Sequence, residues 1–245
     1  MLKALGNQGI PDTWVNLIKQ MYTNLEARII TDTQGTNFPI KKGVKQGDPL
    51  SPILFISALE EIFRQLKWNK KGIKINDAYL NNLKFADDIT IIAKSITELN
   101  EMLHELNMAG KEAGLQMNLE KTKIMTSDRE QQIIIEGKSL EKASEYVYLG
   151  QMISFENQIS KEINRRIALG WKKFWELKEI MKGPYQNKLK SKIFNNTIVP
   201  TIIYGSQTWS LTKKEENQIR TTQNSMERSM LGVRKRDKIR ISKIK

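Results

Sequence analysis

The chain has 245 residues, with 40 Lys and Arg against 27 Asp and Glu, a formal net charge of +13 and a pI of about 9.7. This length allows one or two domains with a real core, and the excess of positive charge favours a polyanionic partner, a basic protein without one being the alternative. The absence of cysteine excludes disulfides and thiolate metal sites, and no apolar run approaches the roughly 18 residues that a transmembrane helix needs.

The first part of the chain is predicted to hold a helix and a hairpin. The helix starts near Pro11 and Asp12, because apolar residues recur at helical spacing over residues 14–21. The hairpin follows, with strands over residues 27–31 and 37–40 around a turn at Gln34 and Gly35.

A second helix is predicted to run from Ser51, its N-cap, through Pro52 at its first position to about Lys67. We expect this helix to be largely buried, because apolar residues nearly encircle its first turns. These residues are Ile53, Leu54, Phe55, Ile56, Ala58, Leu59, Ile62, Phe63 and Leu66.

Two adjacent aspartates, Asp87 and Asp88, lie between two apolar runs, residues 83–86 and 89–93, that are typical of strands. Neighbouring carboxylates at such a junction repel one another and lose hydration. A divalent cation removes both costs, since Mg²⁺ binds one or two carboxylates together with phosphate oxygens. The alternative is an Asp-Asp turn in which aspartate bonds its own backbone. The residues alone leave both interpretations open.

Ser95 and Glu98 form a capping-box pattern that opens the next helix, and Gly114 ends it. His104 is the single histidine of the chain and falls on the polar face of this helix. We therefore interpret His104 as a solvated residue rather than a catalytic one.

The pattern of the second half changes from strands to helices. Strands are expected at residues 123–125, 132–135 and 146–149, and helices at residues 158–183, 186–197 and, after a capping box at Thr212 and Glu215, up to Gly232. Strands and helices followed by helices alone predict an α+β fold. We place the division between residues 1–155 and residues 156–245.

Four short motifs follow one another: QGDPLSP at residues 46–52, FADD at 85–88, GLQMNLEKTK at 114–123 and YLG at 148–150. In this order and at these spacings the chain resembles the reverse transcriptase of non-LTR (LINE-type) retrotransposons, as motifs B, C, D and E of that family. The resemblance is strong from about Gly9 to Gly150 and looser to the end. It implies a partial polymerase palm, an antiparallel sheet with packed helices, followed by a helical thumb-like segment.

The resemblance implies that Asp87 and Asp88 are catalytic metal ligands, Asp87 the principal one, in two-metal nucleotidyl transfer with Mg²⁺ or Mn²⁺. Because side chains alternate along a strand, both can point at one site only if the turn re-aims them. Phe85 stands two residues before Asp87 and is expected on the same face. Its ring either packs under the primer terminus or belongs to the core.

Motifs B and D imply further roles. Gln46 can hydrogen-bond a base or sugar edge, and Gly47 lets the backbone approach closely, so both are implied to line the pocket for nucleotide and template. Lys121 is implied to act as a general acid on the pyrophosphate leaving group. Among 40 basic residues, only its motif distinguishes Lys121.

Tyr148, Leu149 and Gly150 are implied to hold the primer, with a plain strand end and turn as the alternative. In the basic helical segment, residues 161–192 hold ten Lys or Arg against three Glu, beside Trp171 and Trp175. We interpret the aromatic residues as core and some of the lysines as phosphate contacts.

The family's palm also uses an aspartate of motif A, on a strand before the first helix of this chain, and the sequence starts at Met1 within the stretch that follows it. Neither Asp12 nor Asp32 lies in the centre of an apolar strand. We expect a truncated fragment that lacks the fingers and motif A, is inactive by itself and exposes a sheet edge. A non-catalytic protein that binds RNA or an RNA–DNA duplex is the alternative function.

The partners that the resemblance implies are an RNA template, a DNA primer and dNTP, with no membrane. The N-terminal residues MLKALGNQG lack the apolar core of a signal peptide, so we expect an intracellular protein. The basic run of Arg234, Lys235 and Arg236 is a candidate nuclear-import signal. The oligomeric state is left open.

Overall fold

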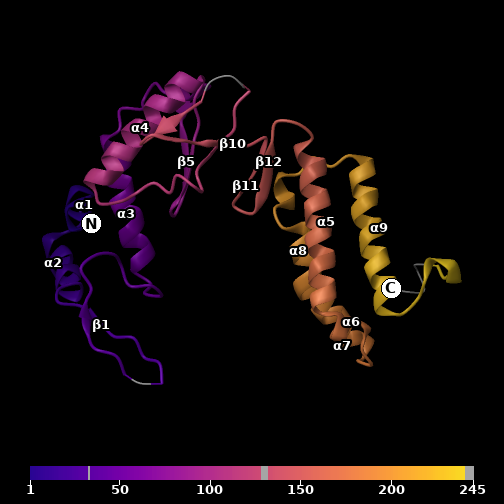
Figure 1. The fold of residues 1–245 in the computed structure, drawn as a ribbon. Helices are drawn as coiled ribbons and strands as arrows, with labels where there is room; N and C mark the ends of the chain where they lie inside the picture. The colour runs from indigo at the N-terminus through magenta and orange to yellow at the C-terminus, as the bar shows by residue number, and fades with distance from the viewer. Residues whose placement is uncertain (33, 128–131, 241–245) are drawn as a thin grey trace. The chain divides into compact units, whose positions relative to one another are not determined.

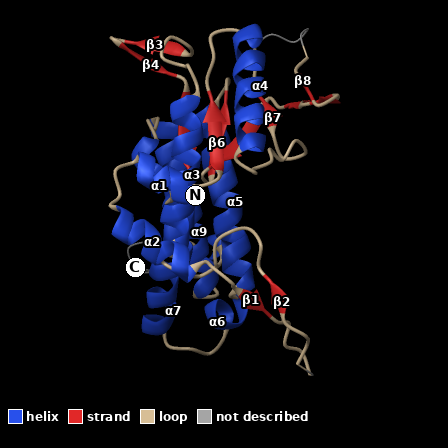
Figure 2. Cartoon of the chain, turned by 90° about the vertical axis from the view of Figure 1, so that its left-hand side faces the viewer, coloured by secondary structure: helices blue, strands red, loops and turns tan. Residues whose placement is uncertain are grey.

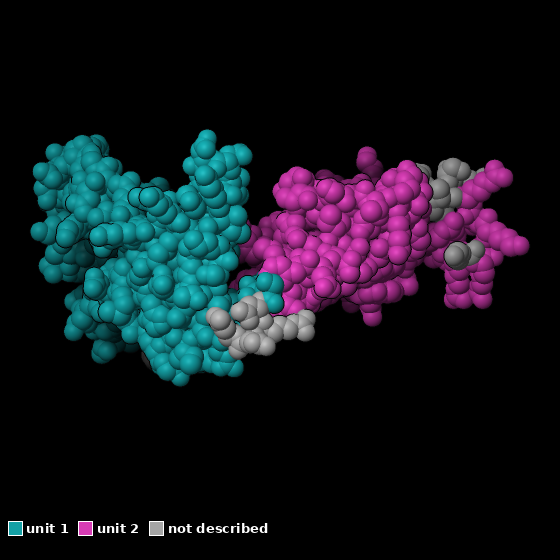
Figure 3. All heavy atoms as spheres, turned by 90° about the horizontal axis from the view of Figure 1, so that it is seen from above, with its two compact units in different colours: residues 1–142 teal, residues 143–245 magenta. Residues whose placement is uncertain are grey.

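The structure is a computed structural model that describes residues 1–32, 34–127 and 132–240. The chain forms two compact units, residues 1–142 and residues 143–245, which are coloured separately in Figure 3. Helices and short strands alternate in the first unit, and helices dominate the second, so the expected α+β class is confirmed (Figures 1 and 2). The boundary between the two compact units, at residues 142 and 143, lies before the boundary predicted at residues 155 and 156. The division into palm and thumb stays a prediction.

The first unit contains four helices and five pairs of strands among the described residues. The helices are α1 Leu2–Asn7, α2 Asp12–Met21, α3 Ser51–Gln65 and α4 Ile96–Glu112. The antiparallel pairs are β1 Glu26–Ala27 with β2 Phe38–Pro39, β3 Ile73–Ile75 with β4 Ala78–Leu80, β5 Asn82–Phe85 with β6 Asp88–Ile91, and β8 Ile134–Ile135 with β9 Lys138–Ser139. The parallel pair is β7 Lys123–Ile124 with β10 Glu141–Lys142.

The main core of the first unit lies between α3, α4 and β6. It consists of the buried residues Leu59, Ile62, Phe63, Trp68, Met102 and Leu106. Ile89 and Ile91 of β6 pack against this cluster, whereas a second cluster lies between α4 and the strands around β7 and β8. The β5–β6 hairpin is therefore held on the helices by one of its two faces.

Helix α3 differs from its prediction in two ways. Its N-cap is Leu50, not Ser51, because the Ser51 hydroxyl instead donates to the backbone carbonyl of Lys45 at 2.5 Å. The expectation of a largely buried helix was wrong, since Ile53 and Ile56 are exposed while Leu54 is buried. One face of α3 covers the core, and the opposite face is open in the described residues.

The capping residues of α4 are confirmed, with one change. Ser95 caps the helix by accepting the backbone N–H of Glu98 at 3.2 Å. The Glu98 carboxylate does not accept the backbone N–H of Ser95, as a full capping box would require. It accepts hydrogen bonds from the backbone N–H groups of Lys94 and Gly72 instead. Gly114 follows the helix with φ +80°, as a glycine stop requires, and His104 is exposed as predicted.

The second unit is a helical bundle with one hairpin. Its elements are β11 Glu145–Tyr148, β12 Gln151–Ser154, α5 Gln158–Glu176, α6 Lys178–Lys182, α7 Asn187–Ile193, a π-helical turn Phe194–Ile198, α8 Val199–Ile203, and α9 Lys213–Met230, with short 3₁₀ turns at Ser206–Thr208 and Lys235–Asp237. Figure 1 shows α5 and α9 side by side. The core of the second unit consists of Phe174, Met181, Phe194, Ile198, Ile202 and Met226.

Two helix predictions of this unit need correction. The expected helix over residues 158–183 is interrupted at Leu177, which separates α5 from α6. The expected end at residue 197 was also wrong, because the chain continues through the π-helical turn into α8 despite Pro200. The wider π turn accommodates a proline ring that would clash with the carbonyl of residue 196 in a regular helix. The Thr212 and Glu215 capping box of α9 is confirmed.

Candidate functional site

The two aspartates lie at the tip of the β5–β6 hairpin. Phe85 pairs with Asp88 across the hairpin, so Ala86 and Asp87 form a two-residue turn, the 86–87 turn. Ala86 has φ +52°, a left-handed conformation that the tight connection imposes. Asp87 therefore belongs to the turn, whereas Asp88 is the first residue of β6.

The turn places Phe85 opposite Asp88. Because Phe85 and Asp88 are directly opposite one another, their side chains share a face, and the strand alternation that would relate Phe85 to Asp87 is broken by the turn. Phe85 is 63% exposed, so it is not part of the core of the described residues. It is available to a ligand on the open face of the hairpin, next to the Asp88 carboxylate.

The other face of the hairpin is fixed to α3. Lys84 donates to the Glu60 carboxylate at 2.6 Å, and its Nζ lies 4.4 Å from the centre of the Phe63 ring. The hydrogen bond from Lys84 lowers the pKa of Glu60 below its ordinary value, against the opposing effect of burial. The hairpin is thus anchored by a charged pair on one side while its tip stays open.

The donor set at the tip fits a hard divalent cation. Asp87 and Asp88 are both exposed and offer carboxylate oxygens, the ligands that Mg²⁺ prefers. Within the described residues, no cluster of three or more His, Cys, Asp or Glu side chains could hold a metal. Two carboxylates match the mode in which Mg²⁺ keeps several positions for water and phosphate oxygens.

Gln46 and Gly47 lie in an exposed loop before α3. Gly47 has φ +86°, and no atom lies within 4 Å of the place that a Cβ would take. Two hydrogen bonds close the loop. The Asp48 carboxylate accepts one from the backbone N–H of Leu50 at 2.8 Å, and the Ser51 hydroxyl donates the other to the carbonyl of Lys45. The backbone at Gly47 can therefore be approached closely from solvent.

Lys121 lies in a turn that follows α4. The Asn118 side chain accepts the backbone N–H of Lys121 at 3.1 Å, and the Lys121 side chain is exposed. A hollow of about 480 Å³ adjoins the preceding residues and is lined by residues 116–120 with Glu136 and Lys138. Lys121 itself is not part of that lining.

Leu149 and Gly150 connect β11 to β12 as a two-residue turn, the 149–150 turn. Tyr148 pairs with Gln151, and the φ angles of the turn are +47° at Leu149 and +76° at Gly150. Two successive left-handed residues are typical of the type I′ turn of hairpins. A leucine at the first of these positions is strained, which indicates that contacts from outside the hairpin hold the turn.

Three residues that the sequence reasoning missed supply those contacts, and a fourth holds two of them in place. Arg165 and Arg166 of α5 both donate from Nη2 to the carbonyl of Gly150. The Tyr204 hydroxyl donates to the Leu149 carbonyl at 3.1 Å, and the Tyr204 ring lies 4.4 Å from the guanidinium carbon of Arg166. The fourth residue is Glu162, which binds both arginines. The spacing of Glu162 to Arg165 and Arg166, three and four residues along a helix, was a signal that the sequence did contain.

Glu162 is the buried centre of this cluster, and its side chain is 1% exposed. Burial raises the pKa of Glu162, but the hydrogen bonds from Arg165, the Met152 N–H and Arg166 outweigh it, so the pKa lies below its ordinary value. The carboxylate is therefore charged at neutral pH and neutralises part of the charge of the two arginines.

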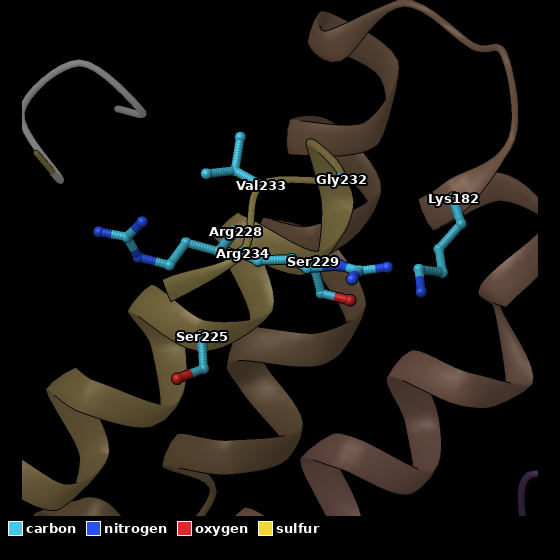
Figure 4. Close-up of a pocket in the computed structure, with 7 residues that line it drawn as sticks. All are labelled: Lys182, Ser225, Arg228, Ser229, Gly232, Val233 and Arg234. Atoms are coloured by element: carbon cyan, nitrogen blue, oxygen red, sulfur yellow. The ribbon is translucent and has the colours of Figure 1, made fainter. Parts of the chain in front are cut away.

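A second basic feature lies at the end of α9. A hollow of about 390 Å³ lies there. Figure 4 shows its lining residues, which come from α9, the turn that follows it and α6. The lining residues are Lys182, Ser225, Arg228, Ser229, Gly232, Val233 and Arg234. The lining offers three cations and two hydroxyls, groups that can contact phosphate, and of the three cations only Lys182 belongs to the basic segment of residues 161–192.

Comparison with known proteins gives one family and several relatives. Residues 2–153, more than half of the chain, match the family described as reverse transcriptase (RNA-dependent DNA polymerase). A transposon-derived protein of Caenorhabditis elegans is 32% identical over 167 residues, which cover 66% of this chain and 60% of that protein.

Two further relatives are retrovirus-related Pol polyproteins of R2 retrotransposable elements. That of Nasonia vitripennis is 26% identical over 83% of this chain and 20% of its own length. That of Drosophila melanogaster is 25% identical over 86% of this chain and 21% of its own length. The chain thus spans well under two thirds of the length of each of these relatives.

Proposed function

The chain belongs to the reverse transcriptase (RNA-dependent DNA polymerase) family, in its non-LTR retrotransposon branch, and on this premise we propose that it carries metal-binding, nucleotide-binding and primer-holding residues of an RNA-directed DNA polymerase. The observation that supports this most is the β5–β6 hairpin, which holds Asp87 and Asp88 at an exposed tip and is anchored to α3 and α4. The family match does not favour a non-catalytic duplex-binding protein.

Enzymes of this family are nucleotidyltransferases that use divalent metals and bind nucleic acid and dNTP. In our proposal Asp87 and Asp88 hold Mg²⁺ or Mn²⁺, which when bound stabilises charge on phosphate oxygens. Phe85 lies beside Asp88 on the open face and contacts the primer terminus. Both carboxylates are exposed, so they can reach the phosphate oxygens that complete the coordination of the ion.

The remaining predicted residues have supporting roles in this proposal. Gln46 and Gly47 bind nucleotide and template, for which the open space at Gly47 provides room. Lys121 donates a proton to the pyrophosphate leaving group. The turn that follows Tyr148 holds the primer strand.

We also propose an intracellular, nuclear place of action for the chain. The support is the basic run over residues 234–236, whose removal in a localisation assay tests it. None of the described helices is long and apolar enough to cross a membrane.

The metal site is tested by paramagnetic broadening. We expect Mn²⁺, added to the isotope-labelled chain with an RNA–DNA primer–template, to broaden the amide signals around the 86–87 turn, and excess Mg²⁺ to reverse the broadening. Asp87→Asn should abolish it. The matched control is Asp77→Asn, since Asp77 occupies the same place in the two-residue turn between β3 and β4. Broadening that is unchanged in Asp87→Asn, or equal at Asp77, would contradict the proposal.

Primer extension tests catalysis by the chain as it stands. The described residues offer two carboxylates at the tip and no larger cluster, so we expect primer–template binding without extension in Mg²⁺ or Mn²⁺. Extension that disappears in Asp87→Ala would prove this expectation wrong and would place a complete site within the 245 residues.

A further inference from the structure

The two arginines that hold the 149–150 turn have different surroundings. Arg166 is buried, with its side chain 7% exposed, and lies beneath the Tyr204 ring. Arg165 is 24% exposed, although it bonds the same carbonyl of Gly150. The pair therefore consists of an inner guanidinium that is enclosed by protein and an outer one at the surface of the turn.

The Glu162 carboxylate fixes the orientation of both guanidinium groups. It accepts hydrogen bonds from Nε of Arg165 at 2.8 Å and from Nε of Arg166 at 2.6 Å. It also accepts a hydrogen bond from the backbone N–H of Met152 in β12 at 2.9 Å. Because Glu162 is bonded to the hairpin and to both arginines, the three groups and the turn form one connected network. Charged bonds of this kind restrict the side chains to a single geometry.

Arg165 keeps donors that this network does not use. Its Nε and Nη2 bond Glu162 and Gly150, which accounts for three of the five N–H donors of a guanidinium group. Within the described residues, Nη1 has no hydrogen-bond partner, and it is not among the buried atoms that lack one. The two remaining N–H groups therefore point to a position that solvent or a ligand can reach.

The network has a net positive charge beside the turn. The single charge of Glu162 faces two arginines, which leaves one positive charge, and Glu145, at the other end of the hairpin, is paired with Lys161 at 3.0 Å. A guanidinium that is held in place and keeps free N–H groups on Nη1 can donate a charge-assisted hydrogen bond to a phosphate oxygen, and it needs little further ordering to do so.

We propose that Arg165 binds, through Nη1, a phosphate of the nucleic-acid strand held at the 149–150 turn, and that Glu162, Arg166 and Tyr204 are positioning residues that aim it. This proposal rests on the proposed primer-holding role of the turn. It assigns the contact with the strand to α5 as well as to the hairpin, and it explains why a strained turn is bonded from three sides.

The unmodified chain provides the first test. We expect the side-chain Nη signals of Arg165 in an NMR spectrum to shift and to exchange more slowly with water when an RNA–DNA primer–template is added. The signals of the enclosed Arg166 should shift less. Unchanged Arg165 signals at saturating duplex would overturn the assignment.

The second test uses variants and the salt dependence of binding. Arg165→Gln should weaken primer–template binding on the order of tenfold, the loss of a charged hydrogen bond, and lower the slope of log K against log salt by about 0.9, one phosphate contact. The matched control is Arg220→Gln, the same change at an exposed position of α9. Equal effects of the two substitutions in folded chains would overturn the proposal.

Conservative variants separate binding from positioning. Arg165→Lys keeps the charge and should restore the salt slope, while the affinity stays reduced several-fold because lysine has no planar guanidinium that Glu162 can hold in place. Tyr204→Phe removes only the bond to Leu149, and we expect faster amide exchange at Gly150 and Gln151 with helix α5 unchanged. Wild-type affinity in Arg165→Lys, or unchanged exchange in Tyr204→Phe, would contradict the respective role.

These outcomes are distinct from failure of the proposed function. If the wild-type chain does not bind primer–template at all, the primer-holding role of the turn falls and this proposal falls with it. If the wild type binds and Arg165→Gln binds equally well, only the assignment of Arg165 is overturned.

Discussion

Ala86 adopts a backbone conformation that alanine reaches only at a cost. Its φ of +52° lies in the left-handed region, which glycine adopts without strain. For other residues this conformation costs roughly 1 kcal/mol of stability. We expect Ala86→Gly to stabilise the first unit by about that amount in denaturant unfolding. Ala78→Gly, in strand β4, should instead destabilise by about 0.5–1 kcal/mol. Destabilisation by both substitutions would show that the turn is not strained.

Glu162 makes the stability of the second unit depend on pH. Its pKa is lowered in the folded state because of its bonds to Arg165, Met152 and Arg166. A carboxyl whose pKa is lowered by folding stabilises the folded state at any pH above its ordinary pKa of 4.5. It loses this contribution as the pH falls through the pKa of the folded state.

We therefore expect unfolding free energies measured from pH 7 down to pH 3 to decrease below about pH 4.5, and Glu162→Gln to flatten this decrease. At neutral pH the substitution leaves buried guanidinium charge unpaired and should cost roughly 3 kcal/mol. Glu216→Gln, which removes an exposed ion pair with Lys213, should cost no more than about 0.5 kcal/mol. An unchanged pH profile in Glu162→Gln would contradict the lowered pKa.

At the scale of elements, the contact between α5 and α8 depends on a glycine. A Cβ at Gly170 would lie 2.8 Å from Cδ1 of Ile202, closer than two carbon atoms can approach. We expect Gly170→Ala to separate the two helices and to cost about 1–3 kcal/mol, although alanine favours a helix over glycine by up to about 1 kcal/mol. Thermal unfolding of the second unit measures the effect.

Two variants decide whether the close approach is the cause. Gly110→Ala in α4 places its Cβ 3.6 Å from the nearest atom, an ordinary contact, and should be stabilising. Combining Gly170→Ala with Ile202→Ala should cost less than the sum of the single changes, because the clash is removed. Additive costs would contradict the assignment.

At the scale of the whole molecule, each unit has a core of its own. Leu59 belongs to the cluster between α3 and α4, and Met226 to the cluster of the second unit. Leu59→Ala and Met226→Ala should each cost about 2–5 kcal/mol, because both residues are buried. We expect hydrogen exchange to accelerate only in the unit that carries the substitution. Equal acceleration in both units would mean that the chain unfolds as one cooperative body.

The extent to which the sequence predicts the candidate site varies from residue to residue. The FADD hairpin was predictable because two strand-like runs flank a tight turn, and the pairing of β5 with β6 confirms it. The pairing of Phe85 with Asp88 was not predicted, since the alternation of side chains applies within a strand and the turn at Ala86 and Asp87 interrupts it. The roles of Gln46, Lys121 and Tyr148 stay predictions.

By itself the sequence determined the family, the α+β class, the caps of α4 and α9, and the place of the paired aspartates. These are local features, since spacing, turn chemistry and motif order are readable within a few residues. The tertiary structure alone decided that one face of α3 is open in the described residues, that Pro200 is accommodated by a π turn, and that Arg165, Arg166 and Tyr204 converge on the 149–150 turn. These contacts join residues that are 15 to 55 positions apart, and local periodicity contains no information about which distant side chains meet.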